Sequence, residues 1–103
     1  MGEFITVGRA DEVADGDAAA FEIEGTEVAV ARVGGKLYAF GDICTHLGCT
    51  LVPGGELDGT EITCGCHGSM FSIETGEVLD GPAARPIEAY PAREADGEIQ
   101  IEV

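Results

Sequence analysis

Basic residues are scarce in this sequence. Its 103 residues include five Lys and Arg against 20 Asp and Glu, and the formal net charge is −15. So negative a chain repels the phosphates of nucleic acids and of anionic membrane surfaces, which argues against both as partners. The same charge favours protein partners that dock through basic surfaces.

Long apolar runs and targeting signals are missing as well. No apolar run approaches the roughly 18 residues of a membrane span. Residues 1–7 have neither the basic nor the apolar segment of a secretory signal. The sequence therefore predicts a cytoplasmic protein with no membrane span. The length suits one domain, residues 1–103, which we expect to be a monomer.

Helical patterns are nearly absent, apart from one short candidate at residues 10–14. Strand patterns recur instead, separated by Gly and Asp turns such as Gly34-Gly35 and Asp96-Gly97. This pattern predicts an all-β fold, a small sandwich or barrel of antiparallel strands. The expected strands cover residues 4–7, 20–23, 28–33, 37–40, 61–63, 70–73, 77–79, 87–92 and 98–103.

The stretch 41–59 interrupts the strand pattern. It has 19 residues, six of them Gly or Pro. A long irregular loop in a domain of this size is usually functional. We therefore expect the functional site to include this loop.

The four cysteines and two histidines of the chain fall into two groups. Residues 44–49 read C-T-H-L-G-C, and residues 64–69 read C-G-C-H-G-S. The combined spacing is C-x-H-x17-C-x2-H, with one further cysteine in each group. Each group thus offers one Cys and one His to a shared site.

Three hypotheses account for these residues. Two disulfides could staple the domain, but this leaves the placement of both histidines unexplained. A structural zinc ion suits two Cys and two His, although zinc fingers place both Cys before both His. An iron–sulfur cluster also fits, because two imidazoles can replace two of the four thiolates of a [2Fe–2S] core.

The two motifs resemble those of Rieske [2Fe–2S] proteins. The resemblance runs over residues 4–103, and in length the chain is most similar to the Rieske-type ferredoxins of bacterial oxygenase systems. It implies three small antiparallel sheets, with two loops that hold one [2Fe–2S] cluster at the tip. The cluster-binding part would span residues 41–86.

The resemblance also implies the metal ligands. Cys44 and Cys64 would bind one iron, and His46 and His67 the other. The remaining cysteines, Cys49 and Cys66, match a pair that forms a disulfide in the Rieske proteins of cytochrome bc complexes. Most oxygenase ferredoxins lack this pair, so the sequence combines features of two subfamilies.

Further residues are implied to surround the cluster. Leu47 would shield it from water, and the two glycines would let backbone N–H groups reach its sulfurs. The Ser69 hydroxyl would hydrogen-bond a bridging sulfide, whereas Phe71 stands where the family has a tyrosine, so one hydrogen bond is lost. The residues of this set are Leu47, Gly48, Gly68, Ser69, Phe71 and Pro82.

The resemblance implies a one-electron carrier rather than an enzyme. Both histidines belong to the cluster motifs, so no catalytic set of residues is left. The protein would accept electrons from an NAD(P)H-dependent flavoprotein reductase and pass them to a terminal oxygenase. The alternatives are an electron-transfer subunit of a nitrite reductase or of a high-potential quinol-oxidising system, and a zinc-stabilised binding module.

Overall fold

The computed structural model describes residues 4–23, 25–43, 50–52, 55–66, 68–81 and 85–102. These residues form strands arranged in three antiparallel sheets, and one short 3-10 helix (η1, Ala10–Glu12). The expected all-β fold and its three sheets are confirmed. No helix in this part of the chain is long and apolar enough to cross a membrane.

The three sheets are named here by position. The basal sheet has the order β1 (Phe4–Arg9), β11 (Glu98–Glu102), β10 (Ala92–Ala95). The central sheet has the order β2 (Ala18–Ile23), β3 (Thr26–Val33), β4 (Lys36–Gly41), β9 (Ala89–Tyr90). The loop sheet has the order β5 (Glu56–Asp58), β6 (Glu61–Thr63), β7 (Met70–Ser72), β8 (Val78–Asp80).

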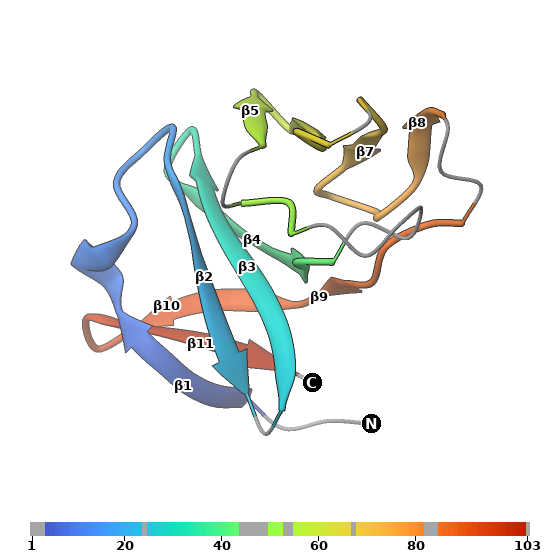
Figure 1. Ribbon diagram of the computed structural model, residues 1–103. Coiled ribbons are helices and arrows are strands. Elements are labelled where there is room, and N and C mark those ends of the chain that lie inside the picture. Colours follow the sequence, from blue (N-terminus) through green and yellow to red (C-terminus); the bar gives the residue numbers. More distant parts are fainter. Residues whose placement is uncertain are drawn as a thin grey trace.

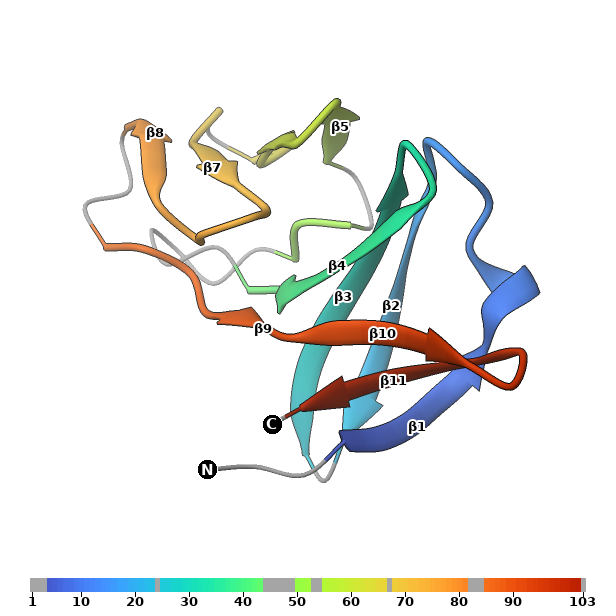
Figure 2. The same ribbon diagram turned by 180° about the vertical axis from the view of Figure 1, so that it is seen from behind.

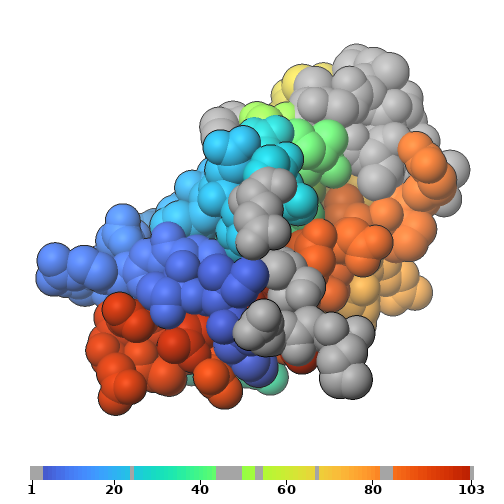
Figure 3. All heavy atoms as spheres, turned by 90° about the horizontal axis from the view of Figure 1, so that it is seen from below, coloured from blue at the N-terminus to red at the C-terminus, as the bar shows by residue number. Residues whose placement is uncertain are grey.

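The central sheet separates the other two. In Figure 1 β10 and β11 of the basal sheet pass behind the lower parts of β2 and β3, and in Figure 2 they pass in front of them, whereas the loop sheet lies at the upper end in both views. Seen from below, β1 lies beside the C-terminal strands of the basal sheet (Figure 3). The loop sheet, which carries the second cysteine–histidine motif, therefore lies at the opposite end from the basal sheet.

Strand β3 is buried on both faces. Val28 and Val30 pack toward the basal sheet, in a core that includes Ile99 and Ile101. The residues between and beyond them, Ala29 and Ala31, belong to a second core, shared with the loop sheet. This double burial explains why residues 28–31 read as a continuous apolar run without alternation.

The second core supports the loop sheet. Phe40 of β4 and Phe71 of β7 are both fully buried in it, together with Leu51 and Ile62. Ala29 and Ala31 both face this core, because successive residues of a strand point to opposite faces. Their small side chains leave room for the larger ones. The loop sheet is thereby anchored to the central sheet by apolar packing.

Two expectations about the strands were wrong. Residues 87–92 do not form one strand: β9 pairs with the central sheet and β10 with the basal sheet, and Pro91 lies between them. Proline has no N–H to continue a ladder, so the chain changes sheets there. The expected loop 41–59 also contains β5, which pairs with β6 across a turn at Gly59, where φ is +60°.

Opposite charges are paired at the basal end but not in the loop sheet. Arg9 lies opposite Glu98 in the basal sheet, and Arg32 forms an ion pair of 3.0 Å with Glu94. In the loop sheet Asp58 lies directly opposite Glu61. Like charges opposite each other destabilise a sheet, so the loop sheet should gain stability when salt screens them.

Replacing Asp58 with Asn should therefore raise the free energy of unfolding at low salt, by about 0.3 kcal/mol. The gain should vanish near 1 M NaCl, where the screening length falls to about 3 Å. Urea unfolding at the two salt concentrations measures this. The matched control is Glu98→Gln, which removes a carboxylate opposite Arg9 and should give no gain at low salt. A destabilised Asp58→Asn variant at low salt would contradict the argument.

Candidate metal centre

The loop between β6 and β7 carries the second cysteine–histidine motif. Its base is closed by two backbone hydrogen bonds: the Cys64 N–H donates to the Ser69 carbonyl at 2.7 Å, and the Gly68 N–H donates to the Cys64 carbonyl at 3.0 Å. They continue the ladder in which Thr63 lies opposite Met70. The position of Cys64 is thus set by the hairpin itself.

Cys64 is not disulfide-bonded and is 2% exposed. It lies at the edge of the second core, where Leu51, Ile62 and Phe71 belong to the same cluster. A buried free cysteine serves as a small apolar group or as a metal ligand. The Ser69 hydroxyl group, at the other end of the loop, is also fully buried.

Cys66 differs from Cys64 in both respects. It is exposed, and it is disulfide-bonded. The partner expected for it, Cys49, lies outside the described residues. Of these two cysteines, Cys66 and not Cys64 is therefore the one in a disulfide.

Two other residues expected near the cluster are described. Gly68 has φ of +79°, a conformation that favours glycine, and it turns the chain back toward β7. Phe71 is fully buried in the second core. An aromatic ring without a hydroxyl group needs no hydrogen-bond partner there, so Phe71 packs without cost.

The loop of the first motif is closed at its stem. Ile43 and Thr50 form an isolated antiparallel bridge, and the Leu51 N–H donates to the Asp42 carbonyl at 2.7 Å. The side chain of Asp42 accepts a further hydrogen bond from the Val52 N–H at 2.8 Å. These bonds hold together the two ends of the segment that contains residues 44–49.

Asp42 is a site residue that the sequence analysis missed. Its side chain is 1% exposed, which is unusual for a carboxylate. Burial raises the pKa of Asp42 above its ordinary value, and the hydrogen bonds from Val52 and Leu51 partly offset this. An acidic residue directly after a buried strand and two positions before a Cys–His motif was the signal available in the sequence.

A third segment, residues 85–88, is held next to these loops. The Ile87 N–H donates to the Gly76 carbonyl at 2.9 Å, and the Gly41 N–H donates to the Glu88 carbonyl at 2.9 Å. Gly76 has φ of +83°, and a Cβ atom there would collide with the Ile87 carbonyl. Glycine is therefore required where the β7–β8 turn meets this segment.

The structure describes only part of the expected site. Of the four expected ligands Cys64 is described, and Cys44, His46 and His67 lie outside the described residues. The same holds for Leu47, Gly48 and Pro82. Among the residues that are described, no three Cys, His, Asp or Glu side chains are grouped so as to hold a metal ion. The buried free thiol of Cys64, on a loop closed by backbone bonds, fits one thiolate ligand of a cluster.

Comparison with known proteins decides between the three hypotheses for the motifs. The family profile of the Rieske [2Fe-2S] domain matches residues 3–91. This chain belongs to the Rieske [2Fe–2S] domain family. Its cofactor is therefore a Rieske-type [2Fe–2S] cluster, as expected, and its match to ferredoxin components makes it an electron-transfer protein rather than an enzyme.

Relatives come from two kinds of system. The cytochrome b6-f complex iron–sulfur subunit of Chlorobaculum thiosulfatiphilum is 42% identical over 89 residues, which are 86% of this chain and 48% of that subunit. The ferredoxin component of the naphthalene 1,2-dioxygenase system of Pseudomonas aeruginosa is 34% identical over 92 residues, 89% of this chain and 88% of that protein. This chain thus spans about half of the first relative and most of the second.

A solved structure shows the same fold. It is the complex of reduced oxygenase and oxidized ferredoxin in carbazole 1,9a-dioxygenase, in which the matched chain has a TM-score of 0.88 and 31% identity to this one. The match covers 96% of this chain and 92% of that chain. The three-sheet fold is therefore that of known Rieske proteins.

Replacing Asp42 with Ala should lower the free energy of unfolding by about 2 kcal/mol, because the Val52 N–H would lose its acceptor. It should also speed the loss of visible absorbance from the holoprotein. Asp42→Asn keeps an acceptor oxygen and should lose less than half as much stability.

The control for this prediction is Asp15→Ala. The Asp15 carboxylate accepts a hydrogen bond of 2.8 Å from the Gly35 N–H, at an exposed position on a turn of the central sheet. This variant should keep its absorbance as the parent protein does. If Asp42→Ala retained both stability and absorbance, the positioning role of Asp42 would be refuted.

Proposed function

We propose that this protein is a Rieske-type ferredoxin that carries single electrons from an NAD(P)H-dependent flavoprotein reductase to a terminal oxygenase. The observation that carries the proposal is the match over nearly the full length of both chains with ferredoxin components of dioxygenase systems. A ferredoxin-like chain in complex with an oxygenase supports the same partner. The net charge of −15 suits docking on basic surfaces of both partners.

In this proposal Cys44 and Cys64 bind one iron of the cluster, and His46 and His67 bind the other. The buried free thiol of Cys64 supports its assignment. When bound, the cluster supplies reversible one-electron chemistry at a potential within about −150 to +300 mV. The protein holds the two ligand-bearing loops through their closed stems.

We assign the disulfide of Cys66 to Cys49. The disulfide-bonded state of Cys66, beside a free Cys64, supports this pairing. Leu47, Gly48, Gly68, Ser69 and Pro82 surround the cluster in the same proposal. The buried hydroxyl of Ser69 and the positive φ of Gly68 agree with these roles.

The proposal places the protein in the cytoplasm as a monomeric single domain, residues 1–103. The reductase in this scheme uses NAD(P)H, which is a reductant of the cytoplasm. A disulfide seldom persists there, so its retention would depend on protection from thiols by the fold.

A second candidate is an electron-transfer subunit of a high-potential system. The 42% identity to a cytochrome b6-f complex subunit and the disulfide-bonded Cys66 favour it. The two candidates differ in the potential that their partners require. Measuring the potential therefore separates them.

The reduction potential of the purified holoprotein should lie at the lower end of the Rieske range, at about −150 mV at pH 7. Redox titration followed by visible absorbance measures it. A positive potential at pH 7 would contradict the oxygenase assignment and support the high-potential candidate. A colourless protein without iron would contradict both.

Replacing His67 with Cys tests the ligand set. A third thiolate adds negative charge to the site, so the potential should fall or the cluster should be lost. Electron paramagnetic resonance of the reduced protein and redox titration measure these outcomes. Thr75→Cys adds a thiol at an exposed turn as the control and should change neither. An unchanged spectrum and potential in His67→Cys would rule out ligation by His67.

A further inference from the structure

Gly55 has the backbone of both ligand-loop stems packed against it. It directly precedes β5, and a Cβ atom on it would collide with the Leu51 carbonyl oxygen. The same Cβ atom would lie 2.7 Å from the Thr63 carbonyl oxygen. Gly55 is not among the described glycines with positive φ, so the space around it, and not its backbone conformation, excludes a side chain.

The first of these two carbonyl groups is part of the stem of the first ligand loop. The Leu51 carbonyl and the Val52 N–H belong to one peptide unit, which is planar and moves as a whole. That N–H donates to the Asp42 carboxylate at 2.8 Å, which is one of the bonds that hold the two ends of the loop together. A displacement of the Leu51 carbonyl therefore also displaces this bond.

The second carbonyl group is part of the stem of the second ligand loop. The Thr63 carbonyl and the Cys64 N–H share a peptide unit, and that N–H donates to the Ser69 carbonyl at 2.7 Å. Glu56 lies opposite Thr63 in the β5–β6 ladder, and the same register continued by one residue brings Gly55 level with Cys64. Crowding at Gly55 would thus reach the backbone of a proposed iron ligand.

Neither peptide unit has room to retreat. Leu51 is fully buried in the second core, and Cys64 is 2% exposed in the same core. Packed interiors yield little when a methyl group is inserted, and here the nearest atoms are backbone carbonyls rather than the ends of flexible side chains. A methyl group at Gly55 would therefore change the spacing of the two stems.

We propose that Gly55 is a positioning residue of the metal centre, which sets the spacing between the two ligand loops. Because it has no side chain, the closing peptide units of both stems pack against one backbone position. One cluster held by both loops requires that spacing to be fixed. The inference rests on the proposed ligand set, in which each loop supplies one Cys and one His.

Gly55→Ala tests the proposal in the holoprotein. The Val52 and Cys64 amides should exchange with deuterium about tenfold faster than in the parent protein, because both closing bonds are weakened. Mass spectrometry of peptides that contain each residue measures this exchange. Electron paramagnetic resonance of the dithionite-reduced protein should show shifted g values, because the ligands on the two loops have moved relative to each other.

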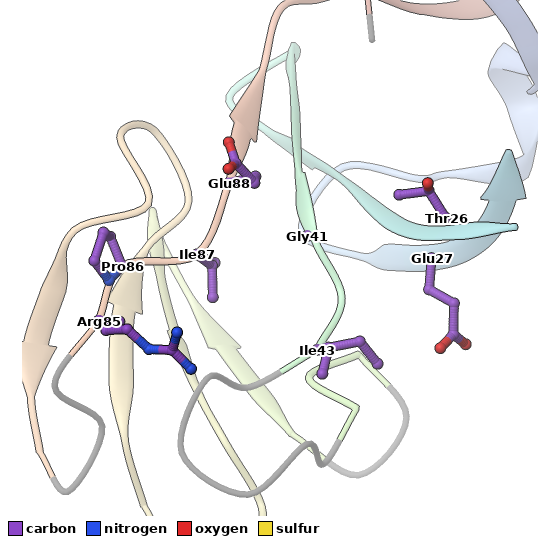
Figure 4. Close-up of a pocket in the computed structure, with 8 residues that line it drawn as sticks. All are labelled: Thr26, Glu27, Gly41, Ile43, Arg85, Pro86, Ile87 and Glu88. Atoms are coloured by element: carbon purple, nitrogen blue, oxygen red, sulfur yellow. The ribbon is translucent and has the colours of Figure 1, made fainter. Parts of the chain in front are cut away.

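Two other glycines provide matched controls. A Cβ atom on Gly41 would make ordinary contacts with Glu88, the nearest at 3.6 Å from its backbone nitrogen, and Figure 4 shows Gly41 across from Glu88 on the strand that leads to Ile43. Gly41→Ala should match the parent protein in both measurements. In the basal sheet a Cβ atom on Gly8 would lie 2.9 Å from the ring of Phe21. Gly8→Ala should therefore lower the unfolding temperature but leave the exchange of the two amides and the g values unchanged.

Three results would overturn the proposal. One is a Gly55→Ala variant with the g values of the parent protein, and another is a Gly8→Ala variant whose g values shift as much. The third is a Gly55→Ala chain that is unfolded by circular dichroism, because Gly55 would then be required by the whole fold rather than by the loop spacing. A folded Gly55→Ala chain that has lost its cluster would support the proposal.

Failure of the proposed ligand set gives a different result. In that case the parent protein itself would lack iron or would show no Rieske-type paramagnetic resonance signal after reduction. The Gly55 proposal would then fall together with the ligand set. A parent protein with that signal, beside an unaffected Gly55→Ala variant, would contradict the positioning role alone.

Discussion

The burial of β3 on both faces is the constraint on which the rest of the structure depends. One face of residues 28–31 completes the core beneath the basal sheet, and the other completes the core beneath the loop sheet. The valines face the first core and the smaller alanines face the second, so the second core has more room for side chains from other strands. The larger side chains Phe40 and Phe71 fill the second core and support the strands that carry Cys64. The position of Cys64 thus depends on packing against a strand of another sheet.

Charge is distributed along the same axis. At the basal end Arg9 forms an ion pair with Asp11 and lies opposite Glu98 in the ladder. The loop end carries carboxylates without bases between Lys36 and Arg85. In the proposed function this negative charge is available to a basic partner.

The sequence predicted those features that depend on local pattern. Strands with alternating or continuous apolar residues were found, such as β11 and β3, and the two Cys–His motifs identified the family correctly. Features that depend on long-range contacts were missed. Three-residue β5 has one partly buried residue, Leu57, and gains its structure from pairing with β6. Asp42 resembles any other acidic residue until the fold buries it against the backbone of Val52.

The two ligand loops have separate closures. The first is closed through Asp42 and the Ile43–Thr50 bridge, and the second through the bonds between Cys64 and the segment 68–69. The two stems share no hydrogen bond, but Leu51 of the first and Cys64 of the second belong to one core, and the proposed disulfide would link their loops covalently. Opening one stem therefore disturbs the packing of the other, and the free energies of opening do not simply add. A group bound by both loops would then be lost through one cooperative opening rather than through two separate ones.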